Sequence, residues 1–170
     1  GKQERSPEQK EDMKIVFSGV SGAGVLDYVS AWYIKTGEYI KRNNKTKSGL
    51  VSTNSITQGE QPGILWNELF TKYNLKIIYA HRTFKWHNEA KGVAAVHCVI
   101  IGFANNNQDI PKTKKLFDYK NIDSEPHILK AKNINPYLVN ATDLVILKRK
   151  KPICNVSEIS FGSMPNDGGE

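Results

Sequence analysis

Apolar and polar residues follow two rhythms along this chain, one typical of helices and one typical of strands. In the polar, charged leader, Pro7 is placed to open a short helix or a loose arm. Leu26, Val29 and Tyr33 then recur at helical spacing. We therefore predict a helix over about 26–41, which ends in the polar stretch KRNNKTKSG with its glycine stop.

Three runs of β-branched and apolar residues predict strands around a second helix. The run GLVSTNSI reads as a buried strand with a polar carboxyl end, and Pro62 is placed for the first turn of the helix that follows it. KIIYAHRTF and VAAVHCVIIGF predict two more strands. Only the polar turn KWHNEAKG joins them, which is too short for a crossover helix, so we expect them to be antiparallel.

This order of elements predicts an α/β fold, the second half of a doubly wound sheet closed by a β-hairpin. The pattern of apolar and polar residues changes after about residue 104. ANNNQDIPKTKK predicts a linker, and the short β-like pieces PHILKA and DLVILK follow among Asn, Pro and Lys. We therefore divide the chain into residues 1–111 and a short, irregular, β-containing segment over 112–170.

Composition narrows the classes of protein that this chain can represent. Its 170 residues, 39% of them hydrophobic, are enough for one globular core. The sequence contains no run of eighteen apolar residues, and its first residues are the opposite of a signal peptide. Two cysteines cannot build a disulfide framework, which favours a reducing, cytoplasmic compartment.

The net charge of +7 is distributed unevenly. Residues 112–151 hold ten Lys/Arg and four Asp/Glu, whereas the tail from residue 152 holds three acids and no base. A basic segment of this kind favours a polyanionic partner, most often nucleic acid. A solvated lysine face would give the same pattern, so charge alone leaves both interpretations open.

The stretch FSGVSGAG resembles a cofactor loop in composition but not in spacing. Gly19, Gly22 and Gly24 form G-x-x-G-x-G, which is neither the dinucleotide fingerprint nor a Walker loop. A flexible connection is therefore the favoured interpretation. The alternative is a self-contained nucleotide-binding α/β domain, which requires residues 15–17 to be a central strand that leads into this loop.

Metal and nucleophilic sites find no support in the sequence. His97 and Cys98 are adjacent on a predicted strand and so point to opposite faces, and no motif of metal-ligand spacing occurs. In HRTFKWHNEAKG, by contrast, Phe84 and Trp86 lie among three cations, Arg82, Lys85 and Lys91. Aromatic rings among cations are suited to stacking on bases and holding phosphates, although rings folded back onto the hairpin would explain them equally well.

Four segments in order carry a resemblance to a known family: LDYVSAWYIKTGEYI, LVSTNSITQGEQ, LWNELFTKYNLKIIYAHRTFKW and NEAKGVAAVHCVIIGF. They resemble the amino-methylating DNA methyltransferases, and most of all the adenine-N6 enzymes of the type IIG restriction–modification kind. NINPYLVNATDLVILKRKKPI and ISFGSMPNDGG are similar to that family's passage into its target-recognition region. The resemblance implies that residues 1–111 are the C-terminal half of a Rossmann-like class I catalytic domain.

Two motifs of the family are absent from this sequence. They are the glycine-rich F-x-G-x-G loop, which holds S-adenosylmethionine, and the Asn-Pro-Pro-Tyr/Phe element, which binds the target amino group. Family order places both upstream of Gly1. The resemblance therefore implies an internal fragment that acts with the remaining domains of the same polypeptide.

The resemblance also implies roles for particular residues. Asp27, Tyr28 and Trp32 match the helix that borders the S-adenosylmethionine pocket. Phe84 matches the hairpin aromatic that stacks on a flipped adenine of double-stranded DNA. The residues implied near the DNA are Asn54, Ser55, Lys85, Trp86 and Lys91, with Ser163, Asn166 and Asp167 in the recognition region.

The implied reaction is methyl transfer from S-adenosylmethionine to adenine N6, with no metal and no membrane involved. Because the cofactor loop is missing, we expect the fragment alone to be inactive. Two alternatives stay open. One is the self-contained nucleotide-binding domain, and the other is a non-enzymatic nucleic-acid-binding module that uses the lysines of 112–151 and the hairpin aromatics.

Overall fold

The computed structural model describes residues 4–86, 96–108, 110–149 and 153–156. Within these ranges no helix is long and apolar enough to cross a membrane. The elements, in chain order, are α1 (Pro7–Val16), η2 (Ala23–Val25), α2 (Ser30–Arg42), β1 (Lys47–Thr53), η3 (Asn54–Thr57), α3 (Gln61–Thr71), β2 (Leu75–Trp86), β3 (Val96–Asn105), β4 (Lys114–Asp118) and β5 (His127–Ala131).

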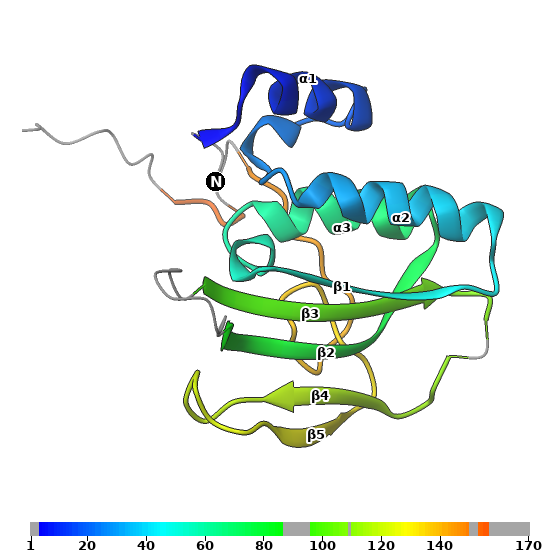
Figure 1. Cartoon of the computed structure of the whole chain (residues 1–170), viewed down its shortest axis with the longest axis vertical. Helices are drawn as coiled ribbons and strands as arrows, with labels where there is room; N and C mark the ends of the chain where they lie inside the picture. Colours follow the sequence, from blue (N-terminus) through cyan, green and yellow to red (C-terminus); the bar gives the residue numbers. More distant parts are fainter. Residues whose placement is uncertain (1–3, 87–95, 109, 150–152, 157–170) are drawn as a thin grey trace, which may run out of the picture.

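The five strands form one sheet in the order β1-β3-β2-β4-β5 (Figure 1). Strand β3 is antiparallel to both of its neighbours, so β1 and β2 run in the same direction, and β4 pairs with β2 in parallel. The α/β class and the antiparallel hairpin are confirmed, while the Rossmann-like half-sheet stays a prediction. The carboxyl ends of β1, β2 and β4 consequently point to the same side of the molecule.

Helix α1 is specified by its amino terminus. Ser6 caps it in a reciprocal capping box with Gln9, and Pro7 occupies the first turn. Ile15 and Val16 belong to this helix rather than to a strand. The structure therefore rules out the self-contained nucleotide-binding domain, because that alternative needed residues 15–17 as a central strand.

The next helix begins later than its apolar pattern predicts. We expected a helix from about residue 26, but α2 begins at Ser30, and Leu26 has an extended backbone (φ −70°, ψ 144°). The reason is a distant side chain: the backbone N–H of Asp27 donates to Oε1 of Gln61 at 3.0 Å. This contact holds the backbone of Asp27 outside the helix. Leu26 still packs in the core as predicted.

Aromatic rings join the helices to the sheet. The ring of Tyr33 on α2 stacks on Phe103 of β3 (centroids 5.6 Å apart), and Trp66 on α3 meets the same Phe103 edge-on at 6.1 Å. The hydroxyl of Tyr33 shares a hydrogen bond of 2.9 Å with Ser52 in β1, so its polar atom is satisfied although the residue is fully buried. Figure 1 shows α2 and α3 side by side next to β1.

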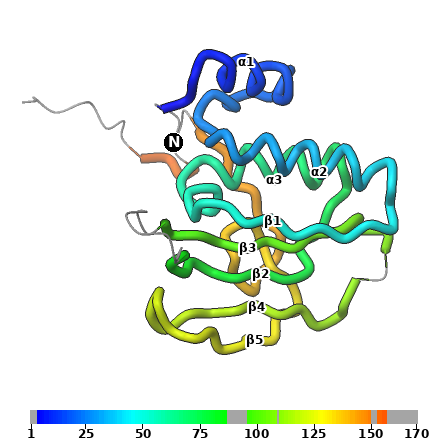
Figure 2. Tube along the Cα trace, in the orientation of Figure 1, coloured from blue at the N-terminus to red at the C-terminus, as the bar shows by residue number. Residues whose placement is uncertain are grey.

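The chain beyond β3 differs in part from expectation. Strand β5 matches the predicted piece PHILKA, but DLVILK forms no strand. Instead these residues run back toward α3 (Figure 2), where the carbonyl oxygen of Ile146 lies against Gly63 so closely that no side chain would fit there. Lys148 then pairs with Glu60 at 3.2 Å, before the start of α3. Tertiary packing on a helix has overridden a β-like sequence.

A buried polar network ties the segment after β5 to the sheet. Lys114 is 4% exposed, and its Nζ donates to Oδ1 of Asn133 at 2.9 Å. Asn133 Nδ2 donates to Asp143 at 2.7 Å, and Lys76 pairs with the same carboxylate. Burial lowers the pKa of Lys114. These described residues join the sheet that contains β1, β2 and β3. The predicted division between residues 111 and 112 stays a prediction.

Candidate functional site

Two groups of predicted site residues lie at one end of the sheet, where the carboxyl ends of β1 and β2 lie on either side of β3. Thr53, the last residue of β1, and Phe84, near the end of β2, both pair with Cys98, from opposite sides of β3. Two strand spacings separate their backbones, roughly 10 Å. Asn54 and Ser55 follow Thr53 in η3, so the structure brings them to the end that also carries Phe84.

Asp27 is the centre of a polar cluster that joins three elements. Its Oδ2 accepts hydrogen bonds from Ser55 Oγ at 2.5 Å and from Gln61 Nε2 at 3.2 Å. Ser55 also shares a hydrogen bond with Thr53 at 2.8 Å. The cluster therefore connects the approach to α2 with η3 and with the first turn of α3. It unites two predicted site residues, Asp27 and Ser55, and adds Gln61.

The electrostatics of this cluster keep Asp27 ionised. Partial burial by itself would raise the pKa of the carboxyl group, but the hydrogen bonds from Ser55 and Gln61, together with nearby positive charge such as that of Arg5, lower the pKa below the ordinary value. A carboxylate with two donors is well suited to holding backbone in place. It is poorly suited to proton transfer near neutral pH.

Tyr28 and Trp32 lie elsewhere, at a cavity of about 360 Å³ between α1 and α2. Trp32 is 61% exposed, and the Tyr28 hydroxyl donates to Oδ2 of Asp12 at 2.7 Å. Apolar residues supply most of the lining, with Asp12 and Lys35 as its charged members. Aromatic and apolar walls with a few polar groups fit an adenine ring in chemical character. The structure thus separates these two residues from the cluster around Asp27.

Phe84 belongs to an aromatic group at the end of β2. The pairing of β2 with β3 shifts register between His81 and Phe84, a bulge-like irregularity. Beyond it, the ring of Phe84 lies 6.1 Å from that of Trp86 and 5.3 Å from that of Tyr119. Phe84 is half-buried and Trp86 is 47% exposed. These rings therefore pack on each other while keeping surface available.

A shallow polar cavity of about 350 Å³ opens at the same end of the sheet. Arg82 borders it and is fixed by two contacts, one to the carbonyl of Leu138 at 2.9 Å and one to Asp118 at 3.0 Å. The ion pair of Arg82 with Asp118 leaves the lining of this cavity with little net charge. The lining residues are Thr57, Gln58, Arg82, Thr83, Asp118, Tyr119, Tyr137 and Leu138.

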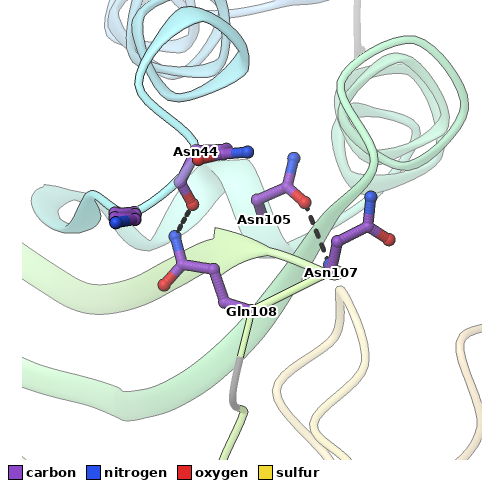
Figure 3. Close-up of a pocket in the computed structure, with 5 residues that line it drawn as sticks. Asn44, Asn105, Asn107 and Gln108 are labelled. Atoms are coloured by element: carbon purple, nitrogen blue, oxygen red, sulfur yellow. Dashed lines mark hydrogen bonds between the residues drawn. The ribbon is translucent and has the colours of Figure 1, made fainter.

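Another cavity, of about 350 Å³, lies at the opposite end of the sheet (Figure 3). Amide side chains line most of it, but they already close the local loops. Gln108 donates to the carbonyls of Asn44 and Thr46, and the Asn107 backbone donates to Asn105 Oδ1 at 2.9 Å. Its position at the start of β1 and the end of β3 separates it from every predicted site residue, so we do not assign it a role.

Some predicted site residues cannot be located. Lys91, Ser163, Asn166 and Asp167 lie outside the described residues. Lys85 is at the end of β2, where its Nζ lies 3.5 Å from Oδ1 of Asp123. Across the described ranges, no group of three His, Cys, Asp or Glu side chains could hold a metal ion.

The sequence did not reveal two residues that hold the predicted site residues in place, Gln61 beside Asp27 and Tyr119 beside Phe84. It also did not reveal the contacts of Arg82 with Leu138 and Asp118. Gln61 is the last residue of the segment LVSTNSITQGEQ and the first residue of α3, and neither position indicates its contact with Asp27. Tyr119 follows a short strand in a region that we predicted to be linker and irregular structure. Each acquires its role through a contact with residues far away in the chain, and a single sequence does not reveal such contacts.

Known proteins similar to this chain include DNA methyltransferases. Residues 1–118 match the family described as the MmeI DNA-methyltransferase domain. The chain is 41% identical over 169 residues to DNA methyltransferase A of Bacillus subtilis (strain 168), covering 99% of the chain and 18% of that protein.

A solved structure shows the same fold. It is the type IIL restriction–modification enzyme MmeI in complex with DNA, which is 47% identical with a TM-score of 0.87. The match covers 99% of this chain and 22% of that one, so the chain spans about a fifth of the length of both relatives. This chain belongs to the MmeI DNA-methyltransferase domain family of restriction–modification enzymes.

Proposed function

We propose that this chain forms the target-base side of a DNA methyltransferase that transfers a methyl group from S-adenosylmethionine to adenine N6. The observation that carries the proposal is the place of Phe84. It lies half-buried in an aromatic group, at the end of the sheet that also holds Asn54 and Ser55. Enzymes that modify a base extrude it from the duplex and hold it by stacking and by hydrogen bonds to its edge.

The chain's own residues supply positioning. Phe84 would stack on the extruded adenine, and Lys85 and Trp86 beside it, with Lys91, would contact the surrounding DNA. Tyr28 and Trp32 would border the bound cofactor, which supplies an electrophilic methyl group. The residues that bind the target amino group would lie in the family's Asn-Pro-Pro-Tyr/Phe motif, which this sequence does not contain.

The cluster around Asp27 supports the site without touching the base. By linking η3 to the starts of α2 and α3, it fixes the polar end of β1, where Asn54 and Ser55 lie. Catalytic geometry tolerates little displacement, so supporting contacts of this kind matter for rate. We assign Asp27 a positioning role rather than direct contact with the cofactor.

The proposal extends to a longer polypeptide. Since the chain covers only 18% and 22% of its two relatives, cofactor binding and site recognition would need further domains. Double-stranded DNA is the proposed partner. The structural relative was determined in complex with DNA, which supports this choice.

The test is a direct analysis of the product. The full-length protein that carries this chain is incubated with DNA and isotopically methyl-labelled S-adenosylmethionine, and the DNA is digested to nucleosides for mass spectrometry. We expect the label on N6-methyladenine. Label on cytosine, or no label in DNA, would overturn the proposal.

A second candidate, a nucleic-acid-binding module without catalysis, is favoured by one feature. Lys115 of β4 and Lys130 of β5 stand directly opposite each other in the sheet. Like charges in this position destabilise a strand pair unless a polyanion lies nearby. The product analysis separates the two candidates, because the module would bind DNA and leave it unmethylated.

A further inference from the structure

The segment that follows β4 lies along the end of β2 and makes contacts with two consecutive residues there. The ring of Tyr119 stacks on that of Phe84, with centroids 5.3 Å apart and planes 24° apart. The backbone N–H of Lys85 donates to the carbonyl of Ile122 at 2.8 Å, and the Lys85 side chain pairs with Asp123. We call residues 119–123 the brace segment.

Tyr119 is itself held at its hydroxyl group. That oxygen lies 2.7 Å from Nδ1 of His81, and the imidazole stacks flat on Phe117, with centroids 4.0 Å apart and planes 2° apart. Burial lowers the pKa of His81, so its ring stays neutral near pH 7 and keeps both roles. The tyrosine ring is therefore fixed from both ends, by stacking and by a hydrogen bond.

The orientation of the Phe84 ring, in contrast, is poorly determined by the regular pairing of its strand. It is the first paired residue after the register shift that begins at His81. A bulge interrupts the regular ladder and turns nearby side chains, so the direction of the Phe84 ring depends on its neighbours. Tyr119 covers part of that ring, and because Phe84 is only half-buried, part of its side chain stays accessible to a base.

We propose that Tyr119, carried by the brace segment, is a positioning residue that orients Phe84 to receive the extruded base. The inference rests on the proposed function, since it assumes that Phe84 stacks on the target adenine. Tyr119 does not need to touch DNA in this arrangement. It lies one residue beyond the span that matches the family's methyltransferase domain, so that match does not identify it.

Base extrusion gives a readout that a purely structural role would not change. The target adenine of a duplex is replaced by 2-aminopurine, whose fluorescence rises when the base leaves the stack. The full-length enzyme is compared with its Tyr119→Ala, Tyr119→Phe and Phe84→Ala variants, and the single-turnover methylation rate is measured on the unmodified duplex. Tyr39→Ala is the matched control, because Tyr39 is an exposed tyrosine on α2.

We expect Tyr119→Ala to lower the methylation rate and the population of extruded base by about two- to tenfold, the range for loss of an aromatic pair. Duplex affinity should stay close to wild type. Tyr119→Phe keeps the ring and should retain most of the activity. The double variant with Phe84→Ala should be no worse than Phe84→Ala alone, because the two rings act as one unit.

Each failure has a distinct signature. If Phe84→Ala lowers extrusion while Tyr119→Ala behaves like Tyr39→Ala, the positioning role is wrong and the proposed function stands. Additive losses in the double variant would also overturn it, since Tyr119 would then act independently of Phe84. If Phe84→Ala itself leaves extrusion and rate unchanged, the proposed function fails with it.

Discussion

At the scale of single residues, Asp27, predicted to border the cofactor, joins three elements of the structure through its hydrogen bonds. Its carboxylate accepts from Ser55 and Gln61, while its backbone N–H donates to Gln61. The two side chains thus fix each other in a reciprocal pair. This arrangement explains both the late start of α2 and the lowered pKa of the carboxyl group.

Removing this carboxylate should destabilise the chain. We expect Asp27→Ala to cost about 1–3 kcal/mol of unfolding free energy, because two donors lose a charged acceptor. Urea denaturation of the 170-residue chain measures the change. Asp12→Ala removes one exposed hydrogen bond, to Tyr28, and should cost far less. Equal effects of the two substitutions would show that the cluster is not an anchor.

The same group predicts a pH dependence. A lowered pKa in the folded state means that the stabilisation is complete above the unfolded-state value of about 3.9 and is lost as pH falls through the folded-state value. Asp27→Asn should therefore be less stable than wild type at neutral pH. The difference should shrink steadily below about pH 4 in urea titrations. A constant difference across this range would contradict the assignment.

Residue-level prediction from the sequence succeeded where chemistry is local. Phe84 and Trp86 lie close to each other as an aromatic pair, although they belong to the last residues of β2 rather than to the turn in which they were expected. Tyr119 and Gln61 could not be identified in this way, because their partners are distant in the chain. The roles assigned to the site residues stay predictions.

At the scale of elements, the segment DLVILK is the clearest case of packing over propensity. Its valine and isoleucine suit a strand, but the backbone crosses α3 at Gly63 instead. A close backbone approach needs a residue without a side chain, and α3 supplies one. Strand β3, by contrast, was predictable because a continuous apolar run is typical of a buried strand. Strand β1 also forms where it was predicted, but the expectation that it is buried was wrong, because it is an edge strand in which only Ser52 is buried.

Gly63→Ala tests this crossing. Alanine normally stabilises a helix by about 0.5–1 kcal/mol relative to glycine. Here its Cβ would overlap the carbonyl of Ile146, so we expect destabilisation by about 1–3 kcal/mol. Gly24→Ala is the control, since open space surrounds that position. A stabilising effect of Gly63→Ala in thermal unfolding would show that residues 143–148 do not pack there.

The opposed lysines of β4 and β5 give a second prediction for an element. Lys130→Gln removes a like-charge pair with Lys115, so the isolated chain should keep or slightly gain stability. DNA affinity of the full-length enzyme should fall, and the slope of log affinity against log salt should drop by about 1. Lys45→Gln, at the other end of the sheet, is the control. An unchanged slope would exclude Lys130 from the DNA interface.

At the scale of the whole molecule, the sheet combines two parts that the sequence suggests are separate. Strands β1, β2 and β3 come from the predicted catalytic half, and β4 and β5 come from the segment predicted as linker and recognition region. Buried contacts through Lys114 and Asn133 hold them together. Strand order could not be predicted, because short strands in polar surroundings give weak patterns.

The absence of the family's glycine-rich loop from this sequence leads to a prediction about cofactor binding. The described cavity beside Trp32 offers aromatic and apolar walls. The family's glycine-rich cofactor loop does not occur in the sequence. We therefore expect isothermal titration calorimetry of the 170-residue chain to show no micromolar affinity for S-adenosylmethionine, and the chain alone to be inactive. Micromolar binding would contradict this account of how the cofactor is held.

The central claim is that Phe84 holds the target adenine, and single-turnover methylation by the full-length enzyme tests it most directly. Loss of base stacking costs about 1–3 kcal/mol. We therefore predict that Phe84→Ala slows methyl transfer by roughly five- to 150-fold while duplex affinity changes little, and that Phe84→Tyr stays near the wild-type rate. A Phe84→Ala enzyme that methylates adenine at the wild-type rate would contradict the claim.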